Sequence, residues 1–334
     1  MGEGKVAYAN DFQGIPAHPN FAELTFLGTG TSCGVPVVGC SCATCTSRDP
    51  RDRRLRCSAT LAFPTRGGLR VLIDAGPDLR AQALAHGFSA FAGCVLTHSH
   101  SDHIGGMSDL REFNGYGAAT VYATDATLAG VRRMFGYIWD PHTAVGGGLP
   151  AVTLAPVRHF APFVVRDPAD PDPRHAVTVT SFPVLHGAME ISGYIFEWIP
   201  DDDHQQDEQQ EGQEQEEKKE EKLIRGLVYI TDASELPDES RTFLTTVRPQ
   251  VLVVNALRYV PHPTHWDVDH AVALAAAVRP TLGTYLVHMN DFCRHCELAA
   301  LLPPGIQPAF DGLSILLPLS DGAVASDASS SSSS

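Results

Sequence analysis

Short apolar runs alternate with helix-like segments along most of the chain. The runs predict strands because they are short, rich in β-branched residues and bounded by glycine or polar residues. The predicted strands cover residues 22–27, 60–63, 69–73, 93–96, 176–185, 191–198, 227–230, 251–254 and 281–287. The segments between them predict helices over 78–86, 126–137, 238–246 and 268–278. Strands that alternate with helices indicate an α/β fold.

Three segments depart from this alternation. Residues 1–20 have no apolar periodicity, so they predict a flexible N-terminal arm. Residues 201–222 are rich in Glu, Gln and Lys and lack apolar anchors, which predicts an acidic, disordered insert. Residues 319–334 end in serines and predict a disordered tail. The remaining span, 21–318, is long enough for a large core, and we expect it to form a single domain.

Composition and charge limit the possible partners. The chain has 334 residues, of which 43% are hydrophobic, but it has no apolar run near the roughly 18 residues of a membrane span. The N-terminus resembles neither a signal peptide nor a transit peptide, so we expect a cytoplasmic protein without a membrane partner. Net charge is −15; eleven acids against three lysines give the insert −8, which leaves −7 elsewhere. An acidic remainder argues against a broad nucleic-acid surface.

The eight cysteines are unevenly spaced. Cys40, Cys42 and Cys45 lie close together, and Cys293 and Cys296 form a second close pair. In a reducing compartment, such spacing indicates metal binding or redox chemistry before it indicates disulfides.

The segment 97–106, Thr-His-Ser-His-Ser-Asp-His-Ile-Gly-Gly, carries the densest chemistry in the chain. It follows an apolar run, and in an extended segment residues two apart point to the same side, so His98 and His100 can hold one cation together. After a turn, Asp102 and His103 can reach a second position. Imidazole and carboxylate ligands suit Zn, Mn or Fe, and two adjacent metals can activate water.

Four further residues stand directly after apolar runs. Asp74 follows 71–73, His186 follows 182–185, Asp232 follows 227–231 and His288 follows 284–287. Taken singly, each could cap a turn or satisfy a core contact. Together with the histidine motif, they predict one polar site at the ends of several strands.

This ordered set resembles the metallo-β-lactamase superfamily over residues 21–318, which implies an αββα four-layer sandwich with a two-metal site. The resemblance implies that His98, His100 and His186 hold one metal. It implies that Asp102, His103 and His288 hold the other, with Asp232 as the bridging ligand. Asp74 then corresponds to the carboxylate that orients the ligands. The implied cofactors are two divalent metals, Zn or Mn.

A second resemblance narrows the family. Residues 25–45, from Thr-Phe-Leu-Gly-Thr-Gly-Thr-Ser to Cys-Ser-Cys-Ala-Thr-Cys, are similar to the N-terminal segment of cyclic phosphodiesterases of the PhnP type. In that family the three cysteines bind a structural zinc together with a histidine three residues after the last active-site ligand. Cys40, Cys42 and Cys45 are present in this chain, but Asp291 replaces the histidine. Asp291 could ligate through oxygen, or His295, Cys293 or Cys296 could substitute for it.

The resemblance also implies a proton donor. The segment 257–266, Leu-Arg-Tyr-Val-Pro-His-Pro-Thr-His-Trp, precedes a helix that Asp267 could cap. A histidine from this segment assists the departing oxygen in the related phosphodiesterases, which makes His265 the first candidate and His262 the second.

The predicted activity is therefore hydrolysis of small or cyclic phosphodiesters by a metal-bridging hydroxide. A thioesterase of the glyoxalase II kind is the alternative on the same scaffold, because the same hydroxide can attack an acyl carbon. A metal-bound interaction module without catalysis is the alternative of another class. The resemblance also suggests a homodimer.

Overall fold

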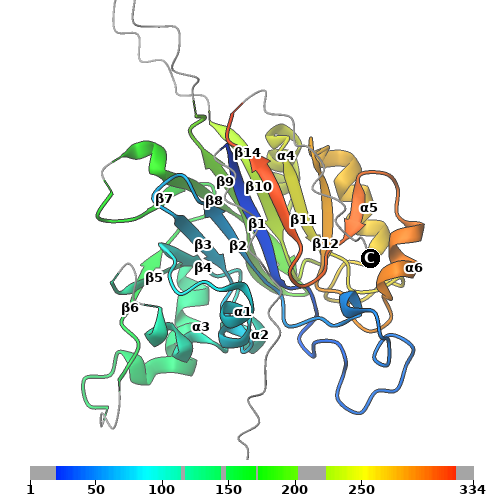
Figure 1. Cartoon of the computed structure of the whole chain (residues 1–334), viewed down its shortest axis with the longest axis horizontal. Coiled ribbons are helices and arrows are strands. Elements are labelled where there is room, and N and C mark those ends of the chain that lie inside the picture. Colours follow the sequence, from blue (N-terminus) through cyan, green and yellow to red (C-terminus); the bar gives the residue numbers. More distant parts are fainter. Residues whose placement is uncertain (1–19, 114–116, 144–147, 171, 202–222, 321–334) are drawn as a thin grey trace, which may run out of the picture.

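Two seven-stranded sheets face each other at the centre of the fold (Figure 1). The computed structural model describes residues 20–113, 117–143, 148–170, 172–201 and 223–320. The predicted N-terminal arm, acidic insert and serine-rich tail lie almost entirely outside the described residues.

The spatial order of the strands differs from their order along the chain. Across the first sheet the order is β14 (Ser314–Pro318), β1 (Phe21–Gly28), β2 (Ser58–Phe63), β3 (Leu69–Ile73), β4 (Gly93–Val95), β5 (Ala119–Ala123) and β6 (Val152–Pro156). Across the second it is β13 (Ile306–Pro308), β12 (Gly283–Val287), β11 (Val251–Asn255), β10 (Ile224–Ile230), β9 (Met189–Trp198), β8 (Ala176–His186) and β7 (Pro162–Arg166). Strands β3 to β6 are parallel, as are β10 to β13, and the other neighbouring pairs are antiparallel.

Helices cover the outer face of each sheet, which completes four layers. On the first sheet lie α1 (Leu79–His86), α2 (Ser101–Ile104) and α3 (Asp125–Phe135). On the second lie α4 (Asp238–Val247), α5 (Val268–Val278) and α6 (His295–Leu301). No helix in the described ranges is long and apolar enough to cross a membrane. The predicted αββα sandwich is confirmed.

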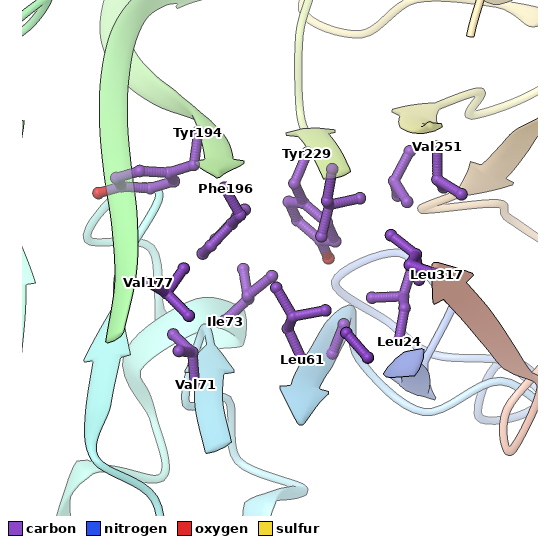
Figure 2. Close-up of a cluster of buried hydrophobic side chains, with 14 of the residues drawn as sticks. Leu24, Leu61, Val71, Ile73, Val177, Tyr194, Phe196, Tyr229, Val251 and Leu317 are labelled. Atoms are coloured by element: carbon purple, nitrogen blue, oxygen red, sulfur yellow. The ribbon is translucent and has the colours of Figure 1, made fainter. Parts of the chain in front are cut away.

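Apolar side chains from the two inner faces interlock between the sheets. Figure 2 shows Phe196 and Tyr229 of the second sheet facing Leu61 and Ile73 of the first, and all four are fully buried. Burying a large apolar side chain contributes roughly 1.5–3 kcal/mol, so this layer supplies much of the driving force for folding. It also sets the two sheets at a fixed spacing.

The pairing brings the ends of several strands to one edge. Strands β3 and β4 are parallel, as are β10 and β12 through β11. Strand β8 is antiparallel to β9, and so is β10, so β8 and β10 run in the same direction. The carboxyl ends of all these strands therefore lie at the same edge of their sheets, as is common for sites in α/β folds.

His295, at the start of α6, is a buried histidine whose protonation we expect to destabilise the fold. The residue is 4% exposed, its ring packs edge-on against Phe310, and its backbone N–H donates to Asp52. Burial, reinforced by the charges of Arg51 and Arg54, lowers the pKa of His295 from 6.5 to about 4. Between pH 6.5 and about pH 4, His295 is protonated in the unfolded chain but not in the folded chain. We therefore expect the free energy of unfolding to fall as the pH decreases through this range.

We expect His295→Gln to reduce this loss of stability in acid. Between pH 7 and about pH 4.5, the parent should lose about 2 kcal/mol of unfolding free energy through His295, and the variant should not. Urea denaturation of both proteins at the two pH values measures the difference. If parent and variant lose the same unfolding free energy, His295 binds its proton as readily in the folded protein as in the unfolded chain, and its pKa is not lowered.

Candidate metal centre

The first half of the site lies after β4, where the chain carries His98 and His100 and then enters α2 with Asp102 and His103. The Nε2 atom of His98 lies 3.0 Å from Nδ1 of His100. The loop after β3 packs directly against this segment, since a Cβ on Gly76 would overlap the carbonyl oxygen of Asp102. A glycine is required there to bring the two loops together.

Asp74 holds this half-site from behind. Its side chain is fully buried and accepts hydrogen bonds from the Thr97 backbone N–H at 2.8 Å and from the Thr97 hydroxyl at 2.9 Å. The Nδ1 atom of His103 lies 2.7 Å from the Asp74 carboxylate. A proton on Nδ1 leaves the lone pair of Nε2 facing the site, which is the tautomer that a metal ligand needs.

The second half of the site comes from the other sheet. Asp232 follows β10, His288 follows β12 and His186 ends β8. Asp74, Asp232 and His288 have φ angles of 60°, 57° and 57°, a left-handed conformation that Asp and His tolerate better than most residues. Such strained positions cluster at functional sites. The His186 ring is fixed by a 2.7 Å hydrogen bond from Nδ1 to the Thr264 carbonyl oxygen.

The two halves together form two neighbouring clusters of ligand atoms. In each cluster the ligand atoms lie within 4.8 Å of one another. One cluster contains His98, His100 and His186, and the other contains Asp102, His103, Asp232 and His288. Asp232 also groups with His186 and His265. Asp232 therefore lies close to ligand atoms of the second cluster and to His186 of the first.

The donor atoms of the second cluster fit a cation. Within the described residues, Nε2 of His103 and Nε2 of His288 are buried and have no hydrogen-bond partner. They nevertheless lie 3.2 Å and 3.0 Å from the carboxylate oxygens of Asp232. Buried polar atoms are costly when unsatisfied, and a divalent metal between nitrogen and oxygen satisfies them. Imidazole with carboxylate suits Zn, Mn or Fe.

Electrostatics favour the same interpretation. Burial opposes ionisation of Asp232, but the adjacent His288 and His103 hold the pKa of its carboxyl well below the usual range. Burial, with the nearby charge of His103, lowers the pKa of His98 well below its usual value. Asp232 is thus ionised and His98 is neutral, the states in which they bind metals. The Asp232 charge outweighs burial at His288 and raises its pKa to about 9, so metal binding there would release a proton.

His265 reaches the site from the loop between β11 and α5. Its Nε2 atom lies 3.1 Å from Oδ1 of Asp232, and its Nδ1 atom lies 2.9 Å from the Thr264 hydroxyl. His262 lies behind it, with Nδ1 3.3 Å from Nδ1 of His265. The loop is joined to the segment after β10 because the Trp266 N–H donates to the Ala233 carbonyl oxygen at 2.6 Å. As predicted, Asp267 caps α5.

The cysteines form a separate cluster. Cys40, Cys42, Cys45 and Asp291 present ligand atoms within 4.8 Å of one another, and the Asp291 carboxylate lies 3.3 Å from the Cys40 sulfur. Each sulfur accepts a backbone N–H: from Cys42 to Cys40, from Cys45 to Cys42 and from Val37 to Cys45. These bonds favour the thiolate form, whereas burial raises the pKa of the Cys45 thiol to about 12. Zinc displaces thiol protons when it binds, and three thiolates with one oxygen fit a tetrahedral zinc.

The alternatives to Asp291 point elsewhere. The Cys293 thiol lies 3.6 Å from the Leu257 carbonyl oxygen, Cys296 is exposed and the His295 ring packs on Phe310.

We therefore expect zinc to bind to the parent with Asp291 as fourth ligand. Asp291→Ala should weaken this zinc by at least about tenfold, as loss of a direct ligand does. Zinc titration with a colorimetric competitor measures this. Unchanged affinity would exclude Asp291 as a ligand.

The chain belongs to the beta-lactamase superfamily: the family's domain model matches residues 69–289. Within the superfamily, the chain is 33% identical to a solved diphosphatase of the PhnP family, with a TM-score of 0.70, and the match covers 90% of this chain and 98% of that one. The zinc-bound PqqB of Methylobacterium extorquens has the same fold, at 21% identity and a TM-score of 0.59 over 88% of this chain and 99% of that one.

Curated relatives also match by sequence, and two of them illustrate the range. An octanoyltransferase from Porphyromonas gingivalis is 31% identical over 295 residues, which are 87% of this chain and 51% of that protein. A coenzyme PQQ synthesis protein B from Bradyrhizobium diazoefficiens is 37% identical over 119 residues, or 32% of this chain and 37% of that protein. The chain thus spans about half of the first relative and less of the second. Family and fold together support a metal-dependent hydrolase.

Apart from Asp74, the residues that hold the ligands in place were not predicted from the sequence. Thr97 bonds Asp74, Thr231 bonds Asp232 and the Thr264 carbonyl oxygen bonds His186. Thr97 and Thr231 each stand directly before a predicted ligand, His98 and Asp232, and this position in the sequence could have indicated them. The third is a backbone contact across the fold and has no sequence signal.

Proposed function

We propose that this protein hydrolyses phosphodiesters, small or cyclic ones, with two divalent metals, Zn or Mn. The observation that carries the proposal is the position of Asp232, which belongs to the cluster with Asp102, His103 and His288 and also groups with His186 of the neighbouring histidine cluster, each cluster combining residues from both sheets. The similarity to a diphosphatase of the PhnP family over nearly the whole length of both chains adds support.

The residues divide the work in this proposal. His98, His100 and His186 would hold one metal, and Asp102, His103 and His288 the other, with Asp232 shared. When bound, such a metal pair supplies an activated water and neutralises charge on the phosphoryl oxygens. Asp74 keeps His103 in its ligating tautomer. His265 gives a proton to the leaving oxygen, a contribution of about 10²–10⁴-fold in rate.

Diphosphate linkages are a second candidate substrate. The similar solved structure is of a diphosphatase. A phosphorus in a substituted diphosphate carries two bridging oxygens and one negative charge, as in a phosphodiester. The same donor set and the same proton from His265 would serve both reactions.

Two other functions make different predictions. A thioesterase would use the same site on an acyl carbon, and one relative named as an acyl-transferring enzyme shares about half of its length with this chain. A metal-bound interaction module would bind metal without turnover.

The test is turnover by purified protein loaded with Mn or Zn. Bis(p-nitrophenyl) phosphate, a dinucleoside diphosphate and an acyl thioester are offered separately, each beside Asp232→Ala. Cleavage of either phosphorus substrate that disappears in the variant supports the proposal and tells the two substrate classes apart. Cleavage of the thioester alone would replace it with a thioesterase. Metal binding without any turnover would favour the interaction module.

A further inference from the structure

Asp232 has four close neighbours. Its Oδ1 atom lies 3.0 Å from Nε2 of His288 and 3.1 Å from Nε2 of His265. Its Oδ2 atom lies 3.2 Å from Nε2 of His103 and accepts a 2.7 Å hydrogen bond from the Thr231 hydroxyl. The three ring nitrogens change their state when a proton or a metal is bound. The hydroxyl remains a donor in every state of the site.

The Thr231 hydroxyl has little freedom to point elsewhere. Thr231 is fully buried directly after β10, and a β-branched side chain has few rotamers. A second acceptor, the sulfur of Cys57, lies 3.7 Å away. Sulfur is a weak acceptor and a carboxylate a strong one, so the proton goes to Asp232.

Cys57 and Tyr229 close off the space behind the hydroxyl. The Cys57 sulfur lies 3.4 Å from the Tyr229 hydroxyl, and both residues belong to the buried layer between the sheets, where Figure 2 shows Tyr229. The Thr231 hydroxyl therefore lies between Cys57 of this buried layer and the Asp232 carboxylate of the site. Rotation of the Asp232 carboxylate would break its shortest hydrogen bond.

We propose that Thr231 is a positioning residue, which fixes the Asp232 carboxylate in the orientation that lets it face both clusters of ligand atoms. This rests on the proposed two-metal function and assigns a role to a residue outside the ligand set. Removing the hydroxyl leaves the carboxylate free to turn toward one cluster and away from the other. Loss of such a supporting hydrogen bond lowers metal affinity by about 10–100-fold.

The test compares metal binding in variants that differ by one group. Thr231→Val removes the hydroxyl and keeps the shape, and Thr231→Ser keeps the hydroxyl. Thr284→Val is the matched control, because Thr284 is buried on β12 and, within the described residues, makes no side-chain hydrogen bond to a site residue. Calorimetric titration of metal-depleted protein with Mn²⁺ gives affinity and stoichiometry. Electron paramagnetic resonance reports whether the two Mn²⁺ ions are magnetically coupled.

We expect Thr231→Val to bind Mn²⁺ about 10–100-fold more weakly and to lose the coupling signal, while Thr231→Ser and Thr284→Val behave like the parent. A folded Thr231→Val that keeps the parent's affinity and coupling would overturn the proposal. So would equal weakening in Thr284→Val, which would indicate a general effect of the core. These readouts need no substrate, so a parent that binds two metals but cleaves no diester would refute the proposed function alone. A parent that binds no Mn²⁺ is titrated with Zn²⁺ in its place, and a parent that binds neither metal would refute both.

Discussion

Asp232→Ala is expected to abolish hydrolysis and to remove metal from the site. The carboxylate lies 3.0–3.2 Å from ring nitrogens of His103, His288 and His265, and it groups both with the second cluster and with His186 of the first. Without it, the two buried histidines lose the negative charge that compensates them. A metal pair contributes several kcal/mol to the transition state, so kcat/KM should fall by at least about a thousandfold.

Metal content and turnover must be measured on the same samples. Elemental analysis of Asp232→Ala should find less than the parent's metal, and circular dichroism should show a folded protein. Asp238→Ala is the control, because Asp238 is an exposed acid at the start of α4 and lies outside the ligand clusters. Full activity in Asp232→Ala would refute the two-metal mechanism. Full metal content with no activity would move Asp232 from the ligands to the reacting groups.

The strands that the sequence predicted are those with buried, continuous apolar runs. All five residues of β11 are buried, for example, and hydrophobicity alone identifies it. Strands β6 and β7 were not predicted: they lie at the edges of their sheets, have mostly exposed or half-buried residues, and their short apolar stretches are bounded by proline and polar residues. The helix α6 was also not predicted. It has seven residues, begins with His, Cys and Glu, and buries only His295 and Leu298, so it shows no clear helical pattern of apolar residues.

The grouping of the ligands was predictable because each one follows a strand. The direction of each side chain was not predictable from local sequence. The fourth position beside the three cysteines shows why. Arg54 is buried and donates to the carbonyl oxygens of Asn290 and Cys293 at 3.0 Å and 2.6 Å. This contact across more than 230 residues sets the course of the loop, and the loop brings Asp291 to the sulfurs.

His265→Gln is expected to slow hydrolysis by about 10²–10⁴-fold while the metals stay bound. The His265 side chain is 13% exposed, and its Nε2 atom lies at the site with Nδ1 held by Thr264, so the ring can hand a proton to a substrate oxygen. The same ring also groups with His186 and Asp232, as a further metal ligand would. Loss of a proton donor would slow hydrolysis with the metals still bound, whereas loss of a metal ligand would also reduce the metal content of His265→Gln.

The leaving group decides between the two roles. A nitrophenolate departs without a proton, whereas an alkyl or ribosyl oxygen needs one, so a proton donor matters far more for the second substrate. We expect His265→Gln to reduce kcat strongly for an alkyl or ribosyl diester and weakly for bis(p-nitrophenyl) phosphate. His262→Gln should affect both less, because His262 faces His265 and not Asp232. Equal losses for both substrates, with lower metal content, would instead make His265 a ligand.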